Sequence, residues 1–304
     1  MSRWTAHDIV HQRGKLAVVT GTGGLGFEDA LQLARVGAEV VIAGRSADKG
    51  ANAVAKIHTA VPSARVRFEA LDLASLNSIE AFAARLRDQA GAIDILINNA
   101  GVMVPPRRQE TRDGFELQLG TNHLGHFALT GRLMPLLRNS THARVVTVSS
   151  IAARNGRIDF DDLNAKTRYR PMPVYSQLKL ACLMFALELD RKSRAGVWGI
   201  DSLAAHPGIA RTDLLHNAPG RSSVIGTVRS LLWFLFQPAW QGALPTLFAA
   251  TADAATSGGY YGPDGMGETR GYPAPARIPS QTLDVSARAR LWQVSEALTG
   301  VSFG

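Results

Sequence analysis

The chain has 304 residues, 46% of them hydrophobic and 19% charged, which excludes extended disorder and provides enough apolar residues for a large core. The longest aliphatic and aromatic run, Leu231 to Phe236, is too short to span a membrane, and the N-terminus lacks the apolar core of a secretory signal. The formal net charge of +8 favours anionic partners, but no nucleic-acid-binding motif accompanies it. With a single cysteine, Cys182, and no metal-binding framework, the chain is expected to be a cytoplasmic protein that binds no metal and no nucleic acid.

Short apolar runs alternate with helical spacing through the first two thirds of the chain. The runs predict strands over residues 15–20, 39–43, 65–70, 93–97, 143–149 and 199–205. Apolar residues at helical spacing predict the intervening helices, over residues 25–36, 47–61, 75–89, 114–137 and 174–194. Continuous apolar strands that alternate with helices indicate an α/β fold, a Rossmann-type doubly wound parallel sheet with helices on both faces.

The last third follows a different pattern. Residues 241–252 are helix-like, and residues 258–262 predict a last edge strand, for about seven strands in all. Residues 263–281 are rich in proline and predict a loop, and a final helix over about 284–298 lies in the C-terminal segment 282–304. Length alone would allow two domains, but no repeat or linker divides the chain, so we expect a single domain over residues 1–304.

A glycine-rich turn connects the first predicted strand to the first predicted helix. The sequence Thr20-Gly-Thr-Gly-Gly-Leu-Gly26 fits the pattern G-x-G-x-x-G at Gly21, Gly23 and Gly26. Glycines at such a turn bring backbone N–H groups against a pyrophosphate, which the helix N-terminus also attracts. The bare pattern is also found in plain turns, but its position here predicts a dinucleotide site that includes Gly24 and Leu25.

The residue after the second predicted strand indicates which dinucleotide binds. Sites for NAD usually place an acidic residue there, whereas this chain has Gly44 followed by Arg45, whose guanidinium suits a 2′-phosphate. This favours NADP(H), the alternative being a solvated surface arginine. Asp72, followed by Leu73 after the third strand, is expected to accept a hydrogen bond from the adenine, or else to lie beside a helix N-cap.

Four further motifs follow in chain order. They are Asn98-Asn99-Ala100-Gly101, then Asn122 in a long helix, Ser150 after the fifth strand, and Tyr175-x-x-x-Lys179 in the next helix. With these motifs in this order, the chain resembles the short-chain dehydrogenase/reductase superfamily from about residue 15 to its end. The segment from Asn155 to Asn164, which lengthens the interval between Ser150 and Tyr175, resembles the branch of retinol dehydrogenases, WW-domain oxidoreductases and protochlorophyllide reductases, as does Tyr260-Tyr-Gly-Pro263.

The resemblance implies a hydride-transfer oxidoreductase that interconverts a carbonyl and an alcohol. Lys179, one helical turn from Tyr175, would favour the phenolate of Tyr175 as proton donor and acceptor. Ser150 would bind the substrate oxygen, and Asn122 would hold a water that links Lys179 to solvent. Without their neighbours, Ser150 would be an ordinary strand-end hydroxyl and Asn122 a helix bend.

The same resemblance assigns further cofactor contacts. Asn99, Ala100 and Gly101 would form the floor of the cofactor site, together with Tyr175 and Lys179. The loop after the sixth strand would cover the nicotinamide with Pro207, Gly208, Ile209 and Thr212. Without the family context, each loop could be a simple turn. The glycine turn is one residue shorter than the family's usual T-G-x-x-x-G-x-G, which puts one phosphate contact in question.

The histidine pair and the apolar segment near the C-terminus each have an ordinary structural explanation beside the functional one. His123 and His126 have a spacing that metal ligands can share, but no third ligand accompanies them, so buried or capping histidines are expected. The segment 211–240, with Trp233, Phe234 and Phe236, lies where the family places an apolar helical substrate lid, which suits a hydrophobic carbonyl or alcohol. It would otherwise be a core helix, a dimer helix or a shallow membrane contact, so a homo-oligomer stays open.

The sequence therefore predicts an NADP(H)-dependent oxidoreductase acting on a hydrophobic small molecule, with NAD(H) as the less favoured cofactor. The alternative is a cofactor-binding regulatory or scaffold protein with little turnover, which the shortened glycine turn would suit. The combination of Ser150, Tyr175 and Lys179 argues against a scaffold.

Overall fold

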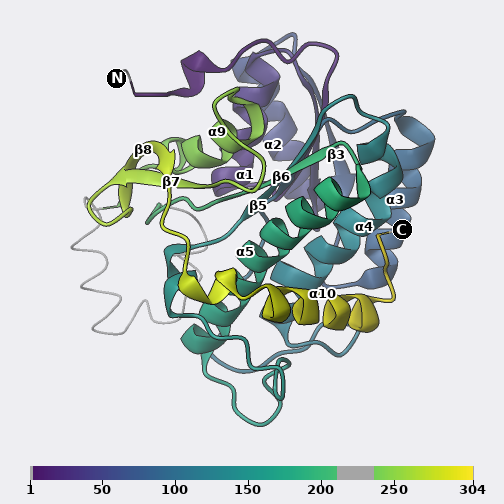
Figure 1. Ribbon diagram of the computed structural model, residues 1–304. Helices are drawn as coiled ribbons and strands as arrows, with labels where there is room; N and C mark the ends of the chain where they lie inside the picture. The colour runs from purple at the N-terminus through teal and green to yellow at the C-terminus, as the bar shows by residue number, and fades with distance from the viewer. Residues whose placement is uncertain (1–2, 211–235, 304) are drawn as a thin grey trace.

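A computed structural model describes residues 3–210 and 236–303 (Figure 1). One eight-stranded sheet has the order β3-β2-β1-β4-β5-β6-β7-β8, in which all neighbours are parallel except β7 and β8. The strands are β1 Leu16–Thr20, β2 Glu39–Gly44, β3 Arg65–Ala70, β4 Ile95–Asn98, β5 Ala143–Val148, β6 Ile200–Ala205, β7 Tyr260–Gly265 and β8 Arg270–Pro275. The strand order reverses between β1 and β4, and a crevice is expected at the carboxyl ends of the strands on either side of this point.

Helices cover both faces of the sheet (Figure 1). Alternate residues of β1 explain the two layers, because Ala17 and Val19 pack into one core while Leu16 and Val18 pack into the other. The first core contains α1 Gly24–Arg35, α2 Ala47–Ala60 and α9 Leu244–Thr251. The second contains α3 Leu76–Gln89, α4 Gly125–Arg138 and α5 Pro171–Gly196, and α10 Val285–Thr299 packs along α5. The predicted doubly wound α/β sheet is confirmed.

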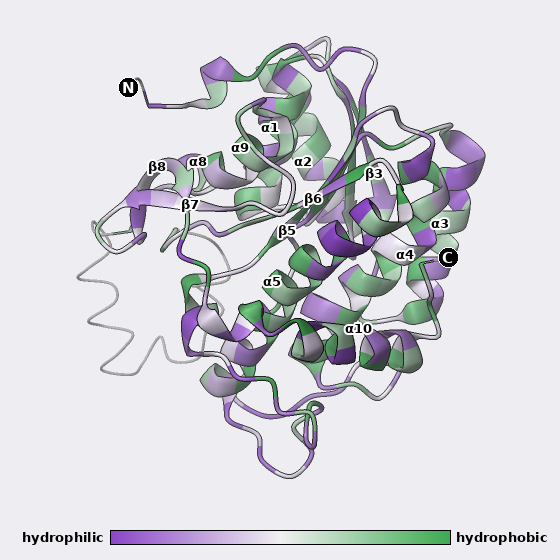
Figure 2. Cartoon of the chain, viewed as in Figure 1, coloured by the Kyte–Doolittle hydropathy of each residue, from purple (hydrophilic) through white to green (hydrophobic). Residues whose placement is uncertain are grey.

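Hydrophilic and hydrophobic residues alternate along the covering helices, as α3 and α10 show in Figure 2. Such a pattern places one side of each helix on the core and leaves the other for solvent. In the described part of the chain, no helix has both the length and the apolar composition needed to cross a bilayer.

The prediction of which strand forms the edge of the sheet is wrong. The strand predicted over residues 258–262 is β7, which lies between β6 and β8, and the edge strand β8 falls inside the predicted loop 263–281. The prolines that suggested a loop are compatible with β8 because a strand at the edge of a sheet does not need every N–H group for pairing. The sheet consequently has eight strands rather than about seven.

Other elements differ in their extent. The helix predicted over 114–137 begins instead with a π-helical turn, η2 Leu119–Leu124, and continues as α4. The helix predicted over 241–252 is divided into α8 Ala239–Gly242 and α9. Short 3₁₀ turns also occur at η1 Ala6–Asp8, η3 Ile151–Asn155 and η5 Ser280–Leu283. Most of the predicted lid, residues 211–235, lies outside the described residues.

Candidate active site

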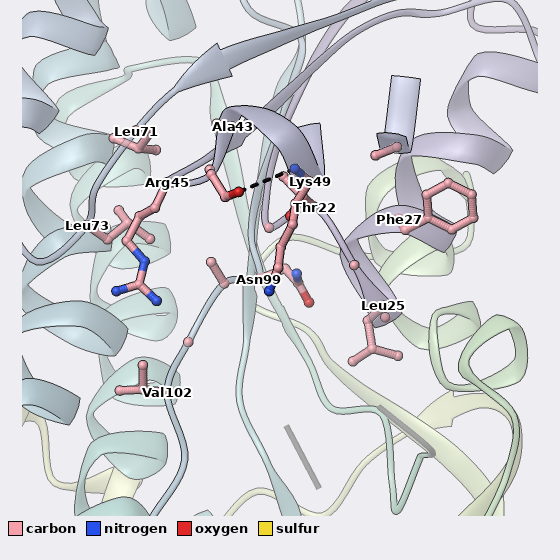
Figure 3. Close-up of a pocket in the computed structure, with 18 of the residues that line it drawn as sticks. Thr22, Leu25, Phe27, Ala43, Arg45, Lys49, Leu71, Leu73, Asn99 and Val102 are labelled. Carbon is pink, nitrogen blue, oxygen red and sulfur yellow. Dashed lines mark hydrogen bonds between the residues drawn. The ribbon is translucent and has the colours of Figure 1, made fainter. Parts of the chain in front are cut away.

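A cavity of about 520 Å³ opens at the carboxyl ends of β1, β2 and β4 (Figure 3). The predicted cofactor residues that line it are Gly21, Gly23, Gly24, Leu25, Arg45, Leu73, Asn99, Ala100 and Gly101. Its wall also includes residues that the sequence did not single out as contacts, among them Thr22, Phe27, Ser46, Lys49, Asn52, Lys56, Val102 and Thr121. In Figure 3, Arg45 and Leu73 are drawn on one side of the cavity, and Phe27 and Leu25 on the other.

The glycine turn has the geometry of an anion cradle. Gly21 and Gly24 adopt positive φ angles of +103° and +53°, which favour glycine. Gly23 is the N-cap of α1 and has no side chain to satisfy the N–H groups of the first turn, which leaves them for an anion. A Cβ at Gly26 would lie 2.6 Å from Asn99 Nδ2 and 2.7 Å from the Gly21 carbonyl oxygen. Gly26 therefore serves close packing beneath the turn rather than lining the cavity.

Thr20 joins the glycine turn to the loop after β4. Its Oγ1 accepts hydrogen bonds from the backbone N–H groups of Asn99 and Ala100, both at 2.9 Å. The Asn99 Nδ2 group donates in return to the Thr20 carbonyl oxygen at 2.8 Å. These bonds fix the floor of the cavity against the end of β1.

His126 connects this floor to η2. Its Nδ1 lies 3.0 Å from the Asn122 carbonyl oxygen, and its Nε2 lies 3.0 Å from Thr20 Oγ1. Burial lowers the pKa of His126 to about 4, so the ring is neutral at physiological pH. Nδ1 must then carry the proton that it donates to the carbonyl, and Nε2 accepts the Thr20 hydroxyl.

His123, one helical turn earlier, is also buried, and its Nε2 lies 2.9 Å from Ser295 Oγ on α10. Burial lowers its pKa to about 3. The expectation that both histidines are buried is confirmed. Among residues 3–210 and 236–303, no cluster of three His, Cys, Asp or Glu side chains could hold a metal ion.

Three cations line the cavity where it borders β2 and α2. Arg45 directly follows β2, and Lys49 and Lys56 extend from α2, whose N-cap Ser46 accepts the Lys49 N–H at 3.3 Å. Lys49, Asn52 and Lys56 are spaced by three and four residues, so they share one face of the helix. That spacing is the sequence signal by which the two lysines could have been found.

Asn122 holds the loop that continues from the cavity floor. Its Oδ1 accepts the Val102 N–H at 2.8 Å, and its Nδ2 donates to the Val102 carbonyl oxygen at 2.9 Å. A Cβ at Gly101 would lie 2.9 Å from Asn122 Oδ1, so a glycine is needed for this close approach. The Asn122 carbonyl oxygen is shared by His126 Nδ1 and the Cys182 thiol, which is 3.3 Å away.

Ser150, Tyr175 and Lys179 come from two elements that pack tightly together. Lys179 is buried, its Nζ donates to the Val148 carbonyl oxygen at 2.9 Å, and it lies 6.0 Å from the centre of the Tyr175 ring. Ser150 is the N-cap of η3, and its Oγ accepts the Ala152 N–H at 3.2 Å. η3 approaches α5 so closely that a Cβ at Gly156 would lie 2.4 Å from the Ser176 carbonyl oxygen. The end of β5 and the start of α5 thus pack together at the carboxyl end of the sheet.

The other predicted contacts lie outside the cavity wall. Asp72 Oδ1 accepts the Ala74 N–H at 3.1 Å, so the side chain stabilises the turn before Ser75, the N-cap of α3. Tyr175 and Lys179 do not line the cavity, and neither do Pro207, Gly208 and Ile209, which follow β6. Thr212 lies outside the described residues.

Comparison with known proteins identifies the family. Residues 15–221 match the short chain dehydrogenase family. The chain belongs to this family. It is 39% identical to human retinol dehydrogenase 13 over 297 residues, covering 95% of this chain and 85% of the relative. It is also 39% identical to mouse polyprenol dehydrogenase, covering 96% of this chain and 86% of that protein. A crystal structure of an uncharacterized protein from Mycobacterium paratuberculosis superposes with a TM-score of 0.82 at 38% identity and covers both chains completely.

Membership of the short-chain dehydrogenase family, in its retinol dehydrogenase-like branch, makes this chain an oxidoreductase acting on CH–OH groups. The family uses NAD(P)(H), and its substrates are small molecules. The glycine cradle lies at the carboxyl end of β1, the edge at which an open α/β sheet binds its ligands.

Proposed function

We propose that this dehydrogenase uses NADP(H) to interconvert a carbonyl and an alcohol on a hydrophobic small molecule. The observation that carries the cofactor choice is that Arg45, Lys49 and Lys56 all line the cavity where it borders β2 and α2. A 2′-phosphate is a dianion that these cations would attract, whereas the 2′-hydroxyl of NAD offers them no charge. The substrate class is supported by the relatives, whose names refer to the apolar alcohols retinol and polyprenol.

The cavity residues fit such a cofactor. The first turn of α1 would bind the pyrophosphate, because Gly23 leaves its N–H groups uncapped. Arg45 and Lys49 would bind the 2′-phosphate, and the floor of Asn99 to Gly101 would support the middle of the molecule. Pro207, Gly208, Ile209 and Thr212 are proposed for the nicotinamide end. The bound cofactor supplies or accepts the hydride.

The protein residues handle the proton and the substrate oxygen. Tyr175 would give its phenolic proton to the oxygen that becomes the alcohol, and would take it back in the reverse direction. Lys179 would favour the phenolate of Tyr175 by its positive charge, and Ser150 would donate a hydrogen bond to the same oxygen. Asn122 holds Val102 with both polar atoms of its amide, so we assign it a positioning role. The water that would link Lys179 to solvent stays a prediction.

The proton donor is tested by Tyr175→Phe. This variant keeps the ring but removes the hydroxyl, so turnover of apolar ketones and aldehydes is expected to fall by about a thousandfold or more, at the limit of detection. NADPH binding, followed by fluorescence, should change little. Full turnover by this variant would refute the assignment, and NADPH binding by the parent without turnover of any substrate would favour the scaffold alternative.

The cofactor choice is tested by Arg45→Ala. Loss of one charge-assisted contact to phosphate should weaken NADPH binding about tenfold or more and leave NADH binding nearly unchanged. Arg35→Ala, which removes an exposed arginine at the end of α1, is the matched control. An equal loss for both cofactors would contradict the 2′-phosphate role.

A cytoplasmic location and a homo-oligomer remain predictions. Cell fractionation and light scattering of the purified protein test them.

A further inference from the structure

A partly buried carboxylate joins two loops that the proposed reaction needs. Glu268 lies between β7 and β8, in the hairpin at the end of the sheet (Figure 1). Its Oε2 lies 2.9 Å from His206 Nε2 and 2.5 Å from Arg154 Nη2, and its Oε1 accepts the Arg277 N–H at 3.0 Å. Glu268 itself adopts a left-handed backbone conformation, with φ of +66°. Residues other than glycine rarely adopt this conformation, and Glu268 adopts it at the point where these contacts meet.

The two partners of Glu268 belong to different parts of the site. His206 follows β6 and directly precedes Pro207, Gly208 and Ile209. Arg154 belongs to η3, whose N-cap is Ser150. One carboxylate thus connects the loop proposed for the nicotinamide end to the turn proposed to hold the substrate oxygen.

The hydrogen bonds around His206 show that its ring donates to Glu268 and that the carboxylate accepts. Burial lowers the pKa of His206, so its ring is neutral. His206 Nδ1 accepts the Gly208 N–H at 3.2 Å, which places the proton on Nε2, and Nε2 donates it to Glu268. Burial alone would raise the pKa of Glu268, but hydrogen bonds from Arg277 N–H and His206, together with the charge of Arg154, lower it overall. Glu268 is therefore an ionised acceptor for both partners.

The backbone of the hairpin completes the connection. The Ile209 N–H donates to the Thr269 carbonyl oxygen at 2.8 Å, and Arg154 Nη1 donates to the Gly267 carbonyl oxygen at 3.2 Å. Gly208 adopts φ of +62°, and a Cβ there would lie 2.3 Å from the Thr269 carbonyl oxygen. A Cβ at Gly262 would lie 2.1 Å from His206 Nε2, so β7 makes room for the imidazole. The hairpin can approach the loop after β6 this closely because Gly208 and Gly262 have no Cβ.

We propose that Glu268 is a positioning residue, which acts through His206 on the loop Pro207–Ile209 and through Arg154 on the turn that carries Ser150. This inference rests on the proposed function, because it assigns these two segments to the reacting end of the site. By holding both, the carboxylate fixes the distance between the loop expected at the nicotinamide and the turn expected to bind the substrate oxygen. Small errors in such a distance reduce the rate of the chemical step more than they reduce binding.

The test compares Glu268→Gln with the parent in the full-length protein. Glutamine keeps the size of the side chain but removes the charge that pairs with Arg154 and strengthens the hydrogen bond from His206. Amide hydrogen exchange in residues 206–210 and 151–155 is expected to become about tenfold faster, and kcat should fall about tenfold or more. Binding of 2′,5′-ADP, which occupies only the adenosine end of the site, should stay within about twofold.

Two variants show whether the effect is specific. Glu80→Gln removes a carboxylate that also joins two arginines, Arg87 at 3.2 Å and Arg132 at 2.6 Å, and it does not line the cavity. It should leave exchange in both segments and kcat unchanged. Arg154→Gln removes only the contact with η3, so exchange should accelerate in residues 151–155 and change little in 206–210. This variant keeps the test decisive if Glu268→Gln does not fold.

The outcomes separate this inference from the proposed function. Unchanged exchange in both segments of Glu268→Gln, or unchanged kcat in an active enzyme, would overturn the positioning role. If the parent turns over no substrate, the proposed function fails, and hydrogen exchange alone still decides whether Glu268 holds the two loops. Faster exchange together with a lower kcat and unchanged 2′,5′-ADP binding supports the proposal.

Discussion

Acid pH should destabilise the folded protein through two buried histidines beside the candidate site. In the unfolded chain a histidine gains a proton near pH 6.5, whereas burial lowers the pKa of His126 to about 4 and that of His123 to about 3 in the folded state. The unfolded state therefore binds more protons than the folded state below pH 6.5, and the free energy of unfolding falls as the pH falls. The loss begins near pH 6.5 and continues to the folded pKa of each ring.

The magnitude for His126 follows from these values. At pH 5 the unfolded histidine is mostly protonated and the folded one is mostly neutral, so His126 lowers the free energy of unfolding by about 2 kcal/mol relative to pH 8. His126→Gln removes this titration together with the ring's bonds to Thr20 and Asn122. At pH 8 the variant should be less stable than the parent by about 1–3 kcal/mol. At pH 5 this difference should be smaller by about 2 kcal/mol.

Urea unfolding of both proteins between pH 5 and 8 measures the difference at each pH. Because groups remote from His126 titrate equally in the two proteins, their contributions cancel. His58→Gln, which replaces an exposed histidine on α2, is the control. A stability difference between parent and His126→Gln that stays constant, or grows in acid, would show that His126 is not a neutral buried ring.

Two further predictions concern α1. Gly26→Ala should abolish cofactor binding, because the added Cβ would lie 2.6 Å from Asn99 Nδ2 and 2.7 Å from the Gly21 carbonyl oxygen. The control is Gly91→Ala, whose Cβ would have no neighbour within 4 Å and which should bind the cofactor normally. Calorimetric titration with NADPH compares the two variants, and normal binding by Gly26→Ala would refute the close packing. Asp29 is fully buried, its carboxyl has no hydrogen-bond partner among the described residues, and burial raises its pKa well above the usual value. The folded state thus holds this proton more tightly than the unfolded state, and Asp29 lowers stability as the pH rises toward its folded pKa. The melting temperature of Asp29→Asn should rise relative to the parent between pH 5 and pH 9, and a pH-independent difference would contradict a neutral buried acid.

The sequence by itself determined most of the fold. Apolar runs such as Leu16–Thr20 alternate with helical spacing, and a strand that is apolar on both faces, alternating with helices, is typical of a parallel sheet covered by helices. The glycine turn and Arg45 were also readable, because each depends on neighbours within a few residues along the chain. A shared face of α2 is equally local, so Lys49 and Lys56 were available to the same reasoning.

Tertiary structure decided the rest, because the decisive contacts join residues far apart in the chain. Local pattern treated the prolines of β8 as a loop, whereas pairing with β7 makes them an edge strand. His126 looked like one of two adjacent histidines, and its bond to Thr20 spans 106 positions. Glu268 lay in a predicted loop, and its bond to His206 spans 62 positions. Periodicity reports how each segment buries its own apolar face, but only the assembled sheet determines which polar groups meet at its edge.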